Sequence, residues 1–296
     1  MPRFKLTIEY SGTRYSGWQI QKNARTVQGE IDRAVKTVTG RKDFELYGSG
    51  RTDAGVHASG QVAHLDVSTN LPPDTLRARI NDELPHDINI LDAVVVSHRF
   101  HARHDAVSRR YVYQIALRRT AFHKAYVWWV KERLEVQRMR SAAAAFVGMR
   151  DFASFADSDE TTSGKSTRVL VERLEIVENG DLLLVVVEGS HFLWKMVRRV
   201  VGVLVEVGRG GIAADTVGRY LADASNAPAR LTAPPSGLFL ARVRYGADAP
   251  DDAIGALTPL ARSLPVRSSQ GGAPGGPKTF LAADANQSVR RRRHQA

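Results

Sequence analysis

Residues 44–67, with the sequence FELYGSGRTDAGVHASGQVAHLDV, predict two β-strands joined by a polar loop. Apolar and polar side chains alternate on both sides of residues 48–57, as expected for strands with one buried face. The loop contains three glycines, which permit backbone conformations closed to other residues. It lacks the spacing of phosphate-binding glycine loops, and no helical pattern follows it. We therefore do not interpret it as a phosphate cradle.

The loop presents two groups that suit catalysis, the Asp53 carboxylate and the Arg51 guanidinium. A nearby opposite charge favours the ionised form of a carboxylate. An ionised, oriented carboxylate is a competent nucleophile at an electrophilic carbon. The alternative is a structural turn, in which Asp53 accepts hydrogen bonds from local backbone amides and Arg51 is a solvated charge. The spacing alone favours this structural alternative, and both interpretations stay open at this point.

The composition favours a folded protein with a polyanionic partner. Hydrophobic residues make up 43% and charged residues 25% of the chain, which are globular values. The formal net charge is +11, which makes nucleic acid the leading candidate partner. An acidic membrane surface comes second, because no strongly basic amphipathic helix or apolar anchor stands out.

The sequence shows no sign of export and no thiol-based site. It has no cysteine, which excludes disulfides and thiolate metal sites and fits a reducing compartment. The N-terminus runs straight into a strand pattern without the apolar core of a signal peptide. No apolar run approaches about 18 residues. We therefore expect a cytoplasmic protein with no membrane partner.

Periodicity predicts one order of elements twice, strand-helix-strand-strand-helix-strand, in residues 1–108 and again in residues 109–245. The expected strands of the first set lie near residues 4–10, 44–48, 62–67 and 88–96, and its helices near residues 26–40 and 76–84. The expected strands of the second set lie near residues 109–117, 168–177, 182–188 and 238–245, and its helices near residues 136–147 and from 192 onward. The predicted fold class is α+β. Two ferredoxin-like, RRM-like halves form a mostly antiparallel sheet, with helices on one side and a catalytic cleft between the halves.

Residues 246–296 differ in composition from the rest of the chain. Proline and glycine recur there, and four arginines occupy residues 290–293. Such composition predicts a disordered tail outside the folded core. The arginine run either adds affinity for RNA or is a solvated tail, and the sequence does not decide between the two.

Two arginines and two tyrosines open the second half, in the order Arg109, Arg110, Tyr111, Val112, Tyr113. On a strand, Tyr111 and Tyr113 face one side and Arg110 faces the other. A tyrosine can stack on an extruded base while arginines hold phosphates, so Arg109 and Arg110 are candidate substrate contacts. An ordinary strand with one buried aromatic face is an equally good interpretation.

Arg198 follows the apolar Val197 on the long predicted helix, which places it at the helix edge within reach of a carboxylate. A surface charge is the alternative for Arg198. Trp194 and Met196 nearby are predicted to be core residues rather than ligand contacts.

The histidines do not make a convincing metal site. His98, His101 and His104 are spaced by three residues, but neither an HExxH pattern nor a cysteine accompanies them. We expect no metal there, and we expect His57 and His64 to form structural hydrogen bonds.

Several short sequence blocks of the chain, taken together, resemble the TruA family of tRNA pseudouridine synthases over nearly all of residues 3–245. Five blocks occur in the order of the family, which is far more specific than any one of them. The blocks are residues 10–12 with 15–19 and 26–28, residues 50–57, residues 100–103 with Arg109, Tyr111 and Tyr113, residues 196–198, and residues 237–238. The chain departs from the family pattern at Lys195, where some members carry histidine, and at Tyr47, where others carry cysteine.

The resemblance implies isomerisation of uridine to pseudouridine in the tRNA anticodon arm, at tRNA positions 38, 39 and 40. It also implies a homodimer and an enzyme without metal or cofactor. Asp53 matches the catalytic aspartate of the family, and Arg51 and Arg198 match the cations around it. Tyr111 matches a pocket tyrosine that lies against the target base and is a candidate acceptor of the C5 proton. Leu238 matches an apolar wall.

Two other functions compete with the synthase. An RNA-binding module without catalysis fits the basic charge, but the aromatic-rich string of an RRM is not evident. A hydrolase that uses Asp53 would release free base. The isomerisation itself breaks the C1′–N1 bond of uridine and joins C5 to C1′ without oxidation or energy input, which explains why no nucleotide-binding motif is needed.

Overall fold

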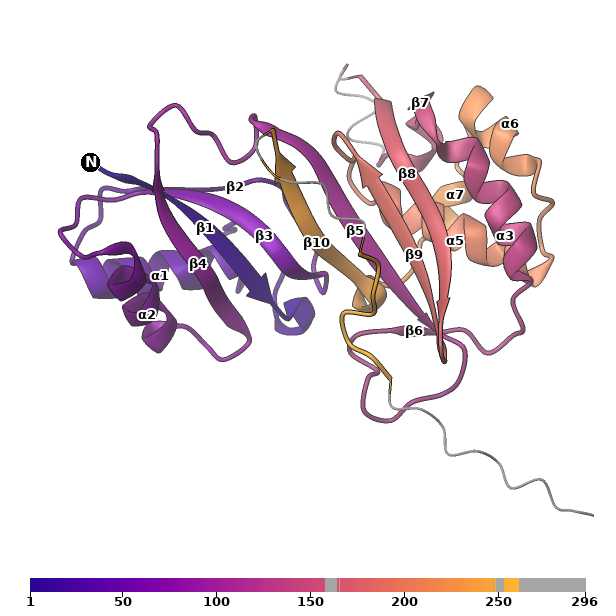
Figure 1. Cartoon of the computed structure of the whole chain (residues 1–296). Coiled ribbons are helices and arrows are strands. Elements are labelled where there is room, and N and C mark those ends of the chain that lie inside the picture. The colour runs from indigo at the N-terminus through magenta and orange to yellow at the C-terminus, as the bar shows by residue number, and fades with distance from the viewer. Residues whose placement is uncertain (158–163, 165, 247, 249–252, 261–296) are drawn as a thin grey trace, which may run out of the picture. The chain divides into compact units, whose positions relative to one another are not determined.

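In the computed structural model, which describes residues 1–157, 164, 166–246, 248 and 253–260, the strands form one sheet (Figure 1). They run in the order β4-β1-β3-β10-β5-β9-β8-β7, with β2 paired to β3 and β6 paired to β5. The strands are β1 (Arg3–Tyr10), β2 (Glu45–Gly48), β3 (His57–Asp66), β4 (Ile88–Val96), β5 (Ala106–Ala116), β6 (Trp128–Trp129), β7 (Gly148–Asp151), β8 (Arg168–Asn179), β9 (Leu182–Gly189) and β10 (Leu238–Tyr245). The pairs β3–β10 and β5–β6 are parallel, and the remaining pairs are antiparallel. The predicted α+β class with a mostly antiparallel sheet is confirmed.

The helices in the described part of the chain are α1 (Val27–Thr39), α2 (Pro73–Glu83), α3 (Val136–Ala143), α5 (Met196–Arg209), α6 (Thr216–Ala222) and α7 (Ala227–Arg230). Short 3-10 turns are η1 (Gly12–Arg14), η2 (Ala144–Phe146), η3 (Ala153–Phe155) and η4 (Pro235–Gly237). None of these helices has the length and apolar character needed to cross a bilayer.

Local signals in the sequence position α1. The Thr26 side chain accepts a hydrogen bond from the Gly29 backbone at 3.2 Å, which caps the helix start. Gly40 ends the helix in the left-handed conformation, with φ 67°. The apolar side of the helix, which includes Ile31 and Val35, is buried against the sheet. The element order of this half, β1-α1-β2-β3-α2-β4, is the predicted one.

The second half follows the predicted order and adds β6, β7, α6 and α7 to it. The long helix α5 starts at Met196, four residues later than expected. The physical reason is Lys195, whose φ of 63° places it in the left-handed region just before the helix. The expected helix at 136–147 ends as α3 at Ala143, followed by a 3-10 turn.

Strand β10 joins the two halves. It pairs along its length with β5 in the second half and makes a short parallel pairing with β3 in the first. In the short pairing, Phe239 lies opposite His57 and Leu240 lies opposite Ala58. Because β3 begins at His57, β10 fixes the end of the loop that carries Asp53 against the second half.

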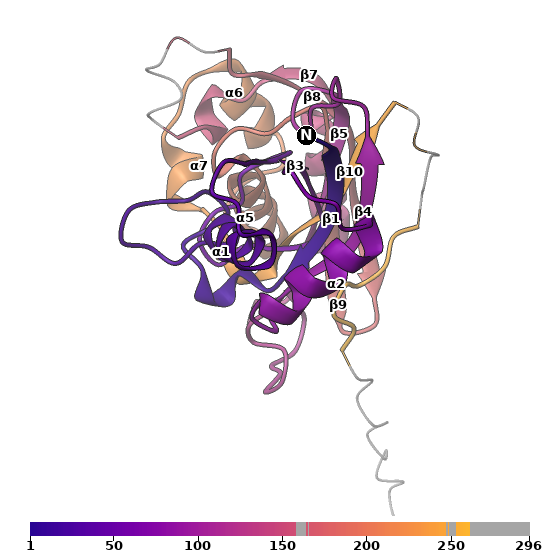
Figure 2. The same ribbon diagram turned by 90° about the vertical axis from the view of Figure 1, so that its left-hand side faces the viewer.

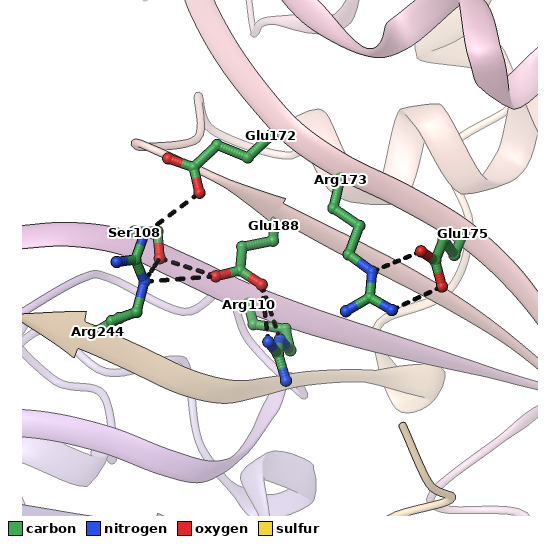
Figure 3. Close-up of polar contacts among 7 residues, drawn as sticks. All are labelled: Ser108, Arg110, Glu172, Arg173, Glu175, Glu188 and Arg244. Atoms are coloured by element: carbon green, nitrogen blue, oxygen red, sulfur yellow. Dashed lines mark hydrogen bonds and ion pairs between the residues drawn. The ribbon is translucent and has the colours of Figure 1, made fainter. Parts of the chain in front are cut away.

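The main helices lie on one side of the sheet, as expected, and Figure 2 shows α1 and α5 together on that side. This side holds the large apolar core, to which both halves contribute. The other side of β5 and β9 carries a small apolar cluster that includes Val112, Leu184 and Val186. It also carries a charged network around Glu188 (Figure 3).

Residues 253–260 cover part of the small apolar cluster. Ile254, Leu257 and Leu260 pack against it. The Leu257 backbone donates to Gln114 Oε1 at 2.8 Å, and Gln114 Nε2 donates to the Thr258 hydroxyl at 2.7 Å. The structure thus differs from the expectation that the chain leaves the folded core after residue 245. The remaining tail, including the arginine run at residues 290–293, lies outside the described residues.

Candidate active site

Aromatic residues of the N-terminal block contact the loop between β2 and β3 and fix its backbone. The Trp18 backbone donates a hydrogen bond to the Thr52 carbonyl at 3.1 Å, and the hydroxyls of Tyr10 and Thr52 are 2.8 Å apart. Gly17 passes so close that a Cβ on it would lie 2.6 Å from the Thr52 carbonyl oxygen. Its φ of 94° is also one that favours glycine. These contacts fix the backbone on which Asp53 sits.

Asp53 pairs with Arg198 across the two halves of the molecule. Arg198 Nη1 lies 3.1 Å from Asp53 Oδ2, although 145 positions separate the two residues in the chain. Both side chains are largely buried, with exposures of 15% for Arg198 and 18% for Asp53. In such a site an ion pair is less screened than at the surface. The prediction that Arg198 reaches a carboxylate from the helix edge is therefore confirmed.

A second hydrogen bond fixes the Arg198 guanidinium. Its Nε donates to the Ala233 carbonyl at 2.8 Å, and the Ala233 backbone donates in return to the Arg198 carbonyl at 3.0 Å. The Arg198 guanidinium is thus oriented by two hydrogen bonds, one to a backbone carbonyl and one to the Asp53 carboxylate. Nothing in the sequence pattern points to Ala233, because the contact depends on the fold of the chain after α7.

Tyr111 lies close enough to Asp53 for the two groups to interact electrostatically. Burial raises the pKa of Tyr111 well above its ordinary value, and the negative charge of Asp53 adds to the effect. The ring packs edge-on against Phe192, with ring centroids 5.3 Å apart. Among the described residues its hydroxyl has no hydrogen-bond partner. The Tyr111 hydroxyl is therefore protonated at neutral pH.

Leu238 lies on the same face of the sheet as Tyr111. In the ladder between β10 and β5, Leu238 is opposite Tyr113 and Leu240 is opposite Tyr111. Directly opposed residues share a face, so these apolar side chains flank the tyrosines. The Tyr113 hydroxyl donates to the Pro234 carbonyl at 2.8 Å and is thereby engaged. Leu240 is thus the residue directly opposite Tyr111, and the role of Leu238 as an apolar wall stays a prediction.

Arg51 is exposed and, among the described residues, forms no ion pair with Asp53. The carboxylate is paired with Arg198 instead. The proposed role of Arg51 as the cation that holds Asp53 is not what the structure shows. A catalytic role for Arg51, which lies on the same loop as Asp53, stays a prediction.

Arg109 is buried and forms hydrogen bonds that support the loop carrying Asp53. Its Nη2 donates hydrogen bonds to the carbonyls of Ser49 and Arg103, and its Nη1 donates to those of Ala106 and Ser190. Burial lowers its pKa. Since Ser49 begins the loop before Asp53, Arg109 ties the catalytic loop to β5. A role as a phosphate contact is not visible in this arrangement.

Arg110 points to the opposite face of the sheet. It forms a buried ion pair with Glu188, with the two charged groups 2.9 Å apart. The Glu188 carboxylate also accepts a hydrogen bond from the Ser108 hydroxyl. Arg244 joins this group through the Ser108 hydroxyl at 3.1 Å (Figure 3). The alternation of side chains along β5 therefore separates Arg110 from Tyr111, and the structure does not bring Arg110 to Asp53.

His57 and His64 form structural hydrogen bonds, as predicted. His57 Nδ1 accepts from the Gly12 backbone at 3.1 Å, and its Nε2 donates to the Ala125 carbonyl at 3.0 Å. Burial lowers the pKa of His57 to about 4, so the ring is neutral at physiological pH. His64 Nδ1 accepts from the Ala102 backbone at 3.2 Å. In the part of the chain that the structure describes, no group of three or more histidine or acidic side chains is placed to hold a metal ion.

The arrangement as a whole suits nucleophilic attack at a sugar carbon. It offers an oriented carboxylate with a fixed cationic partner, a tyrosine ring for a planar base, and apolar side chains that flank the tyrosine. A sequence model of the family described as tRNA pseudouridine synthase matches residues 6–105 and 142–246. The chain belongs to the tRNA pseudouridine synthase family. The matched segments include Asp53, Arg198 and Leu238, whereas Tyr111 lies between them.

Relatives within this family cover nearly the whole folded part of the chain. A protein of Nitrobacter hamburgensis called tRNA pseudouridine synthase A is 42% identical over 248 residues, which are 83% of this chain and 100% of the relative. A namesake from Bradyrhizobium sp. is 41% identical with the same coverage. One from Protochlamydia amoebophila is 40% identical over 82% of this chain and 96% of its own length. As a pseudouridine synthase, the chain is an isomerase.

Proposed function

We propose that this chain converts uridine to pseudouridine in tRNA, with Asp53 as the nucleophile and without a cofactor. The named relatives act on tRNA, and the net charge of +11 suits a polyanionic substrate. The observation that carries the proposal is the pairing of Asp53 with Arg198, because it places one oriented carboxylate beside a tyrosine ring.

The reaction is an internal rearrangement. The Asp53 carboxylate attacks the nucleotide, at C1′ of the sugar or at C6 of the base, and the C1′–N1 bond breaks. The released base turns within the pocket, C5 forms a bond to C1′, and the bond between the Asp53 carboxylate and the nucleotide breaks, which frees the carboxylate for the next turnover. C5 then loses its proton and N1 gains one, so atoms balance without a redox partner. The target nucleotide has to be extruded first, at a cost of a few kcal/mol that stacking on Tyr111 would offset.

The electrostatics bear on the roles of the two neighbours. Arg198 orients the Asp53 carboxylate through their ion pair. Burial and the charge of Asp53 both oppose ionisation of Tyr111. This supports a role in stacking on the base and donating a hydrogen bond, in preference to a role as the free base that removes the C5 proton.

Three finer assignments rest on the resemblance of the sequence blocks. They are the anticodon arm as the target, with tRNA positions 38, 39 and 40, action as a homodimer, and a cytoplasmic location. We include them in the proposal because the chain matches its named relatives over almost their whole length.

One assay tests the central claim. The protein is incubated with tRNA that carries tritium at uridine C5, and released tritium and free uracil are measured. We expect tritium release without free uracil. Free uracil would indicate a hydrolase, and binding without either product would indicate an RNA-binding module.

Variants then test the residues. Asp53→Asn should abolish turnover while tRNA affinity stays within a few-fold, and Arg198→Ala should lose activity while the protein stays folded. Asp43→Asn, on an exposed residue before β2, serves as the matched control and should behave as the wild type. Continued turnover by Asp53→Asn would contradict the nucleophile assignment.

A further inference from the structure

Residues 117–126, which connect β5 to β6, form an exposed loop that the proposed mechanism does not use; we call it the 117–126 loop. Phe122 near its middle is 90% exposed, more than any other large apolar side chain in the described part of the chain. Trp129, just beyond the loop, is 41% exposed, and the Arg119 guanidinium lies 5.9 Å from its ring centroid. Aromatic faces and cations thus occur together on this surface.

The charged side chains of residues 117–131 are all basic. No aspartate or glutamate occurs between residues 117 and 131, whereas Arg118, Arg119, Lys124 and Lys131 do. Arg118 pairs with Asp181 of the β8–β9 hairpin at 2.5 Å. Arg119 and Lys124 are exposed, and neither forms an ion pair with any described residue. Two cations are therefore available to an outside anion, with an aromatic ring between them in the chain.

The end of the loop is fixed to the catalytic part of the molecule. The Ala125 carbonyl accepts the hydrogen bond from His57, the residue that ends the catalytic loop, and the Tyr126 ring lies 5.1 Å from the His57 ring. Gln114 donates to the Tyr126 carbonyl at 2.9 Å. The Ser236 hydroxyl donates to the Val127 carbonyl at 3.3 Å. The C-terminal end of the 117–126 loop is thus anchored beside the loop that carries Asp53.

We propose that the 117–126 loop is a second tRNA contact outside the catalytic pocket, in which Phe122 stacks on a nucleobase and Arg119 and Lys124 contact phosphates. This inference rests on the proposed function for the identity of the RNA. Stacking on an aromatic ring combined with cations along the backbone is the usual way in which proteins hold unpaired nucleotides. The absence of acidic residues between 117 and 131 suits a polyanion such as RNA.

The test compares tRNA binding and turnover of the full chain and its variants. Phe122→Ala should raise the dissociation constant for tRNA about 5- to 100-fold, in line with the loss of one stacked base. Phe122→Trp should restore binding because it keeps a ring face. The turnover number at saturating tRNA should stay within about two-fold of the wild type, since Asp53 and Arg198 are untouched. The melting temperature should not change, because Phe122 is exposed.

The charges are tested separately. The double variant Arg119→Ala/Lys124→Ala should bind tRNA more weakly and lower the salt dependence of binding, the slope of log K against log salt, by about one to two. Met149→Ala and Arg150→Ala, on exposed residues of β7, are matched controls for lost apolar area and lost charge. Both should bind tRNA as the wild type does.

The outcomes separate this inference from the proposed function. An active wild type with unchanged tRNA affinity in Phe122→Ala and in the double variant would overturn the inference and leave the synthase intact. A change of oligomeric state in Phe122→Ala, with affinity per protomer unchanged, would also overturn it and identify the loop as a contact between copies. A wild type that binds tRNA through Phe122 but releases no tritium would support the loop contact and reject the synthase.

Discussion

The Asp157 carboxylate lies 2.8 Å from the ammonium group of Lys195, the residue directly before α5. The same Asp157 oxygen accepts a hydrogen bond from Arg199 Nη2 at 3.3 Å. One carboxylate therefore holds two residues on either side of Arg198 in the chain. It fixes the first turn of α5, from which Arg198 reaches Asp53.

Removing this carboxylate should weaken both the fold and the reaction. Asp157→Asn removes a negative charge that lies 3.3 Å from the Arg199 side chain, which is only 8% exposed. We expect the free energy of unfolding in urea to fall by about 1–3 kcal/mol. We also expect the turnover number to fall more than the KM changes, because Arg198 loses its support. Asp215→Asn, on an exposed residue before α6, should stay within about 0.5 kcal/mol of the wild type.

Two substitutions at Tyr111 distinguish stacking from proton transfer. If the ring supports the base, Tyr111→Phe should keep activity within about ten-fold, whereas Tyr111→Ala should lose considerably more. The raised pKa of Tyr111 also predicts no loss of wild-type activity from its ionisation up to about pH 10. Single-turnover rates across pH 6 to 10 would check this. A Phe variant as inactive as the Ala variant would point to the hydroxyl as the essential group.

His57 should make stability depend on pH. Its pKa is lowered to about 4 by burial, so between about pH 4 and its ordinary value near 6.5 the unfolded chain binds a proton that the folded chain does not. Stability from this group is fully present above pH 6.5 and is lost as the pH falls toward 4, by up to about 3 kcal/mol.

Urea unfolding at pH 7 and pH 5 measures this dependence. The difference between the two values should shrink in His57→Gln, which keeps hydrogen-bonding groups but cannot be protonated in this range. His86→Gln, on an exposed histidine, should leave the difference unchanged. An equal pH dependence in wild type and His57→Gln would show that other groups cause it.

Alanine should be tolerated at Gly50, within the loop that carries Asp53, and not at Gly17, which packs against that loop. Gly17→Ala would force a positive φ of 94° on a residue with a side chain and place its Cβ 2.6 Å from the Thr52 carbonyl. We expect a loss of about 1–3 kcal/mol in unfolding free energy and a matching loss of activity. At Gly50 no atom lies within 4 Å of an added Cβ, so Gly50→Ala should unfold at nearly the wild-type denaturant concentration.

Local patterns predicted those parts of the fold that depend on neighbouring residues. The ends of α1 follow from Thr26 and Gly40, and the bounds of β4 follow from its apolar run. Asp53 and Arg198 were candidates from their residue types and positions, and the resemblance to a family gave them catalytic roles. The structure brings the two residues together. The spacing within the loop alone favoured a structural turn for Asp53.

The features that the sequence did not reveal depend on distant segments. The four carbonyl acceptors of Arg109 come from three separate parts of the chain, so its residue type alone suggested a phosphate contact. The left-handed Lys195 lies in an apolar helical pattern that hides the break. Residues 253–260 were assigned to the tail because proline and glycine recur through residues 246–296, although Leu257 packs on the sheet.

The position of β10 between β3 and β5 has a consequence for synthesis of the protein. This strand starts at Leu238, whereas its partner β3 starts at His57, so nearly the whole chain must leave the ribosome before the two can meet. Contacts of such long sequence separation form slowly during folding. A nascent chain interrupted before residue 238 would lack the bridge between its halves and hence a competent catalytic centre.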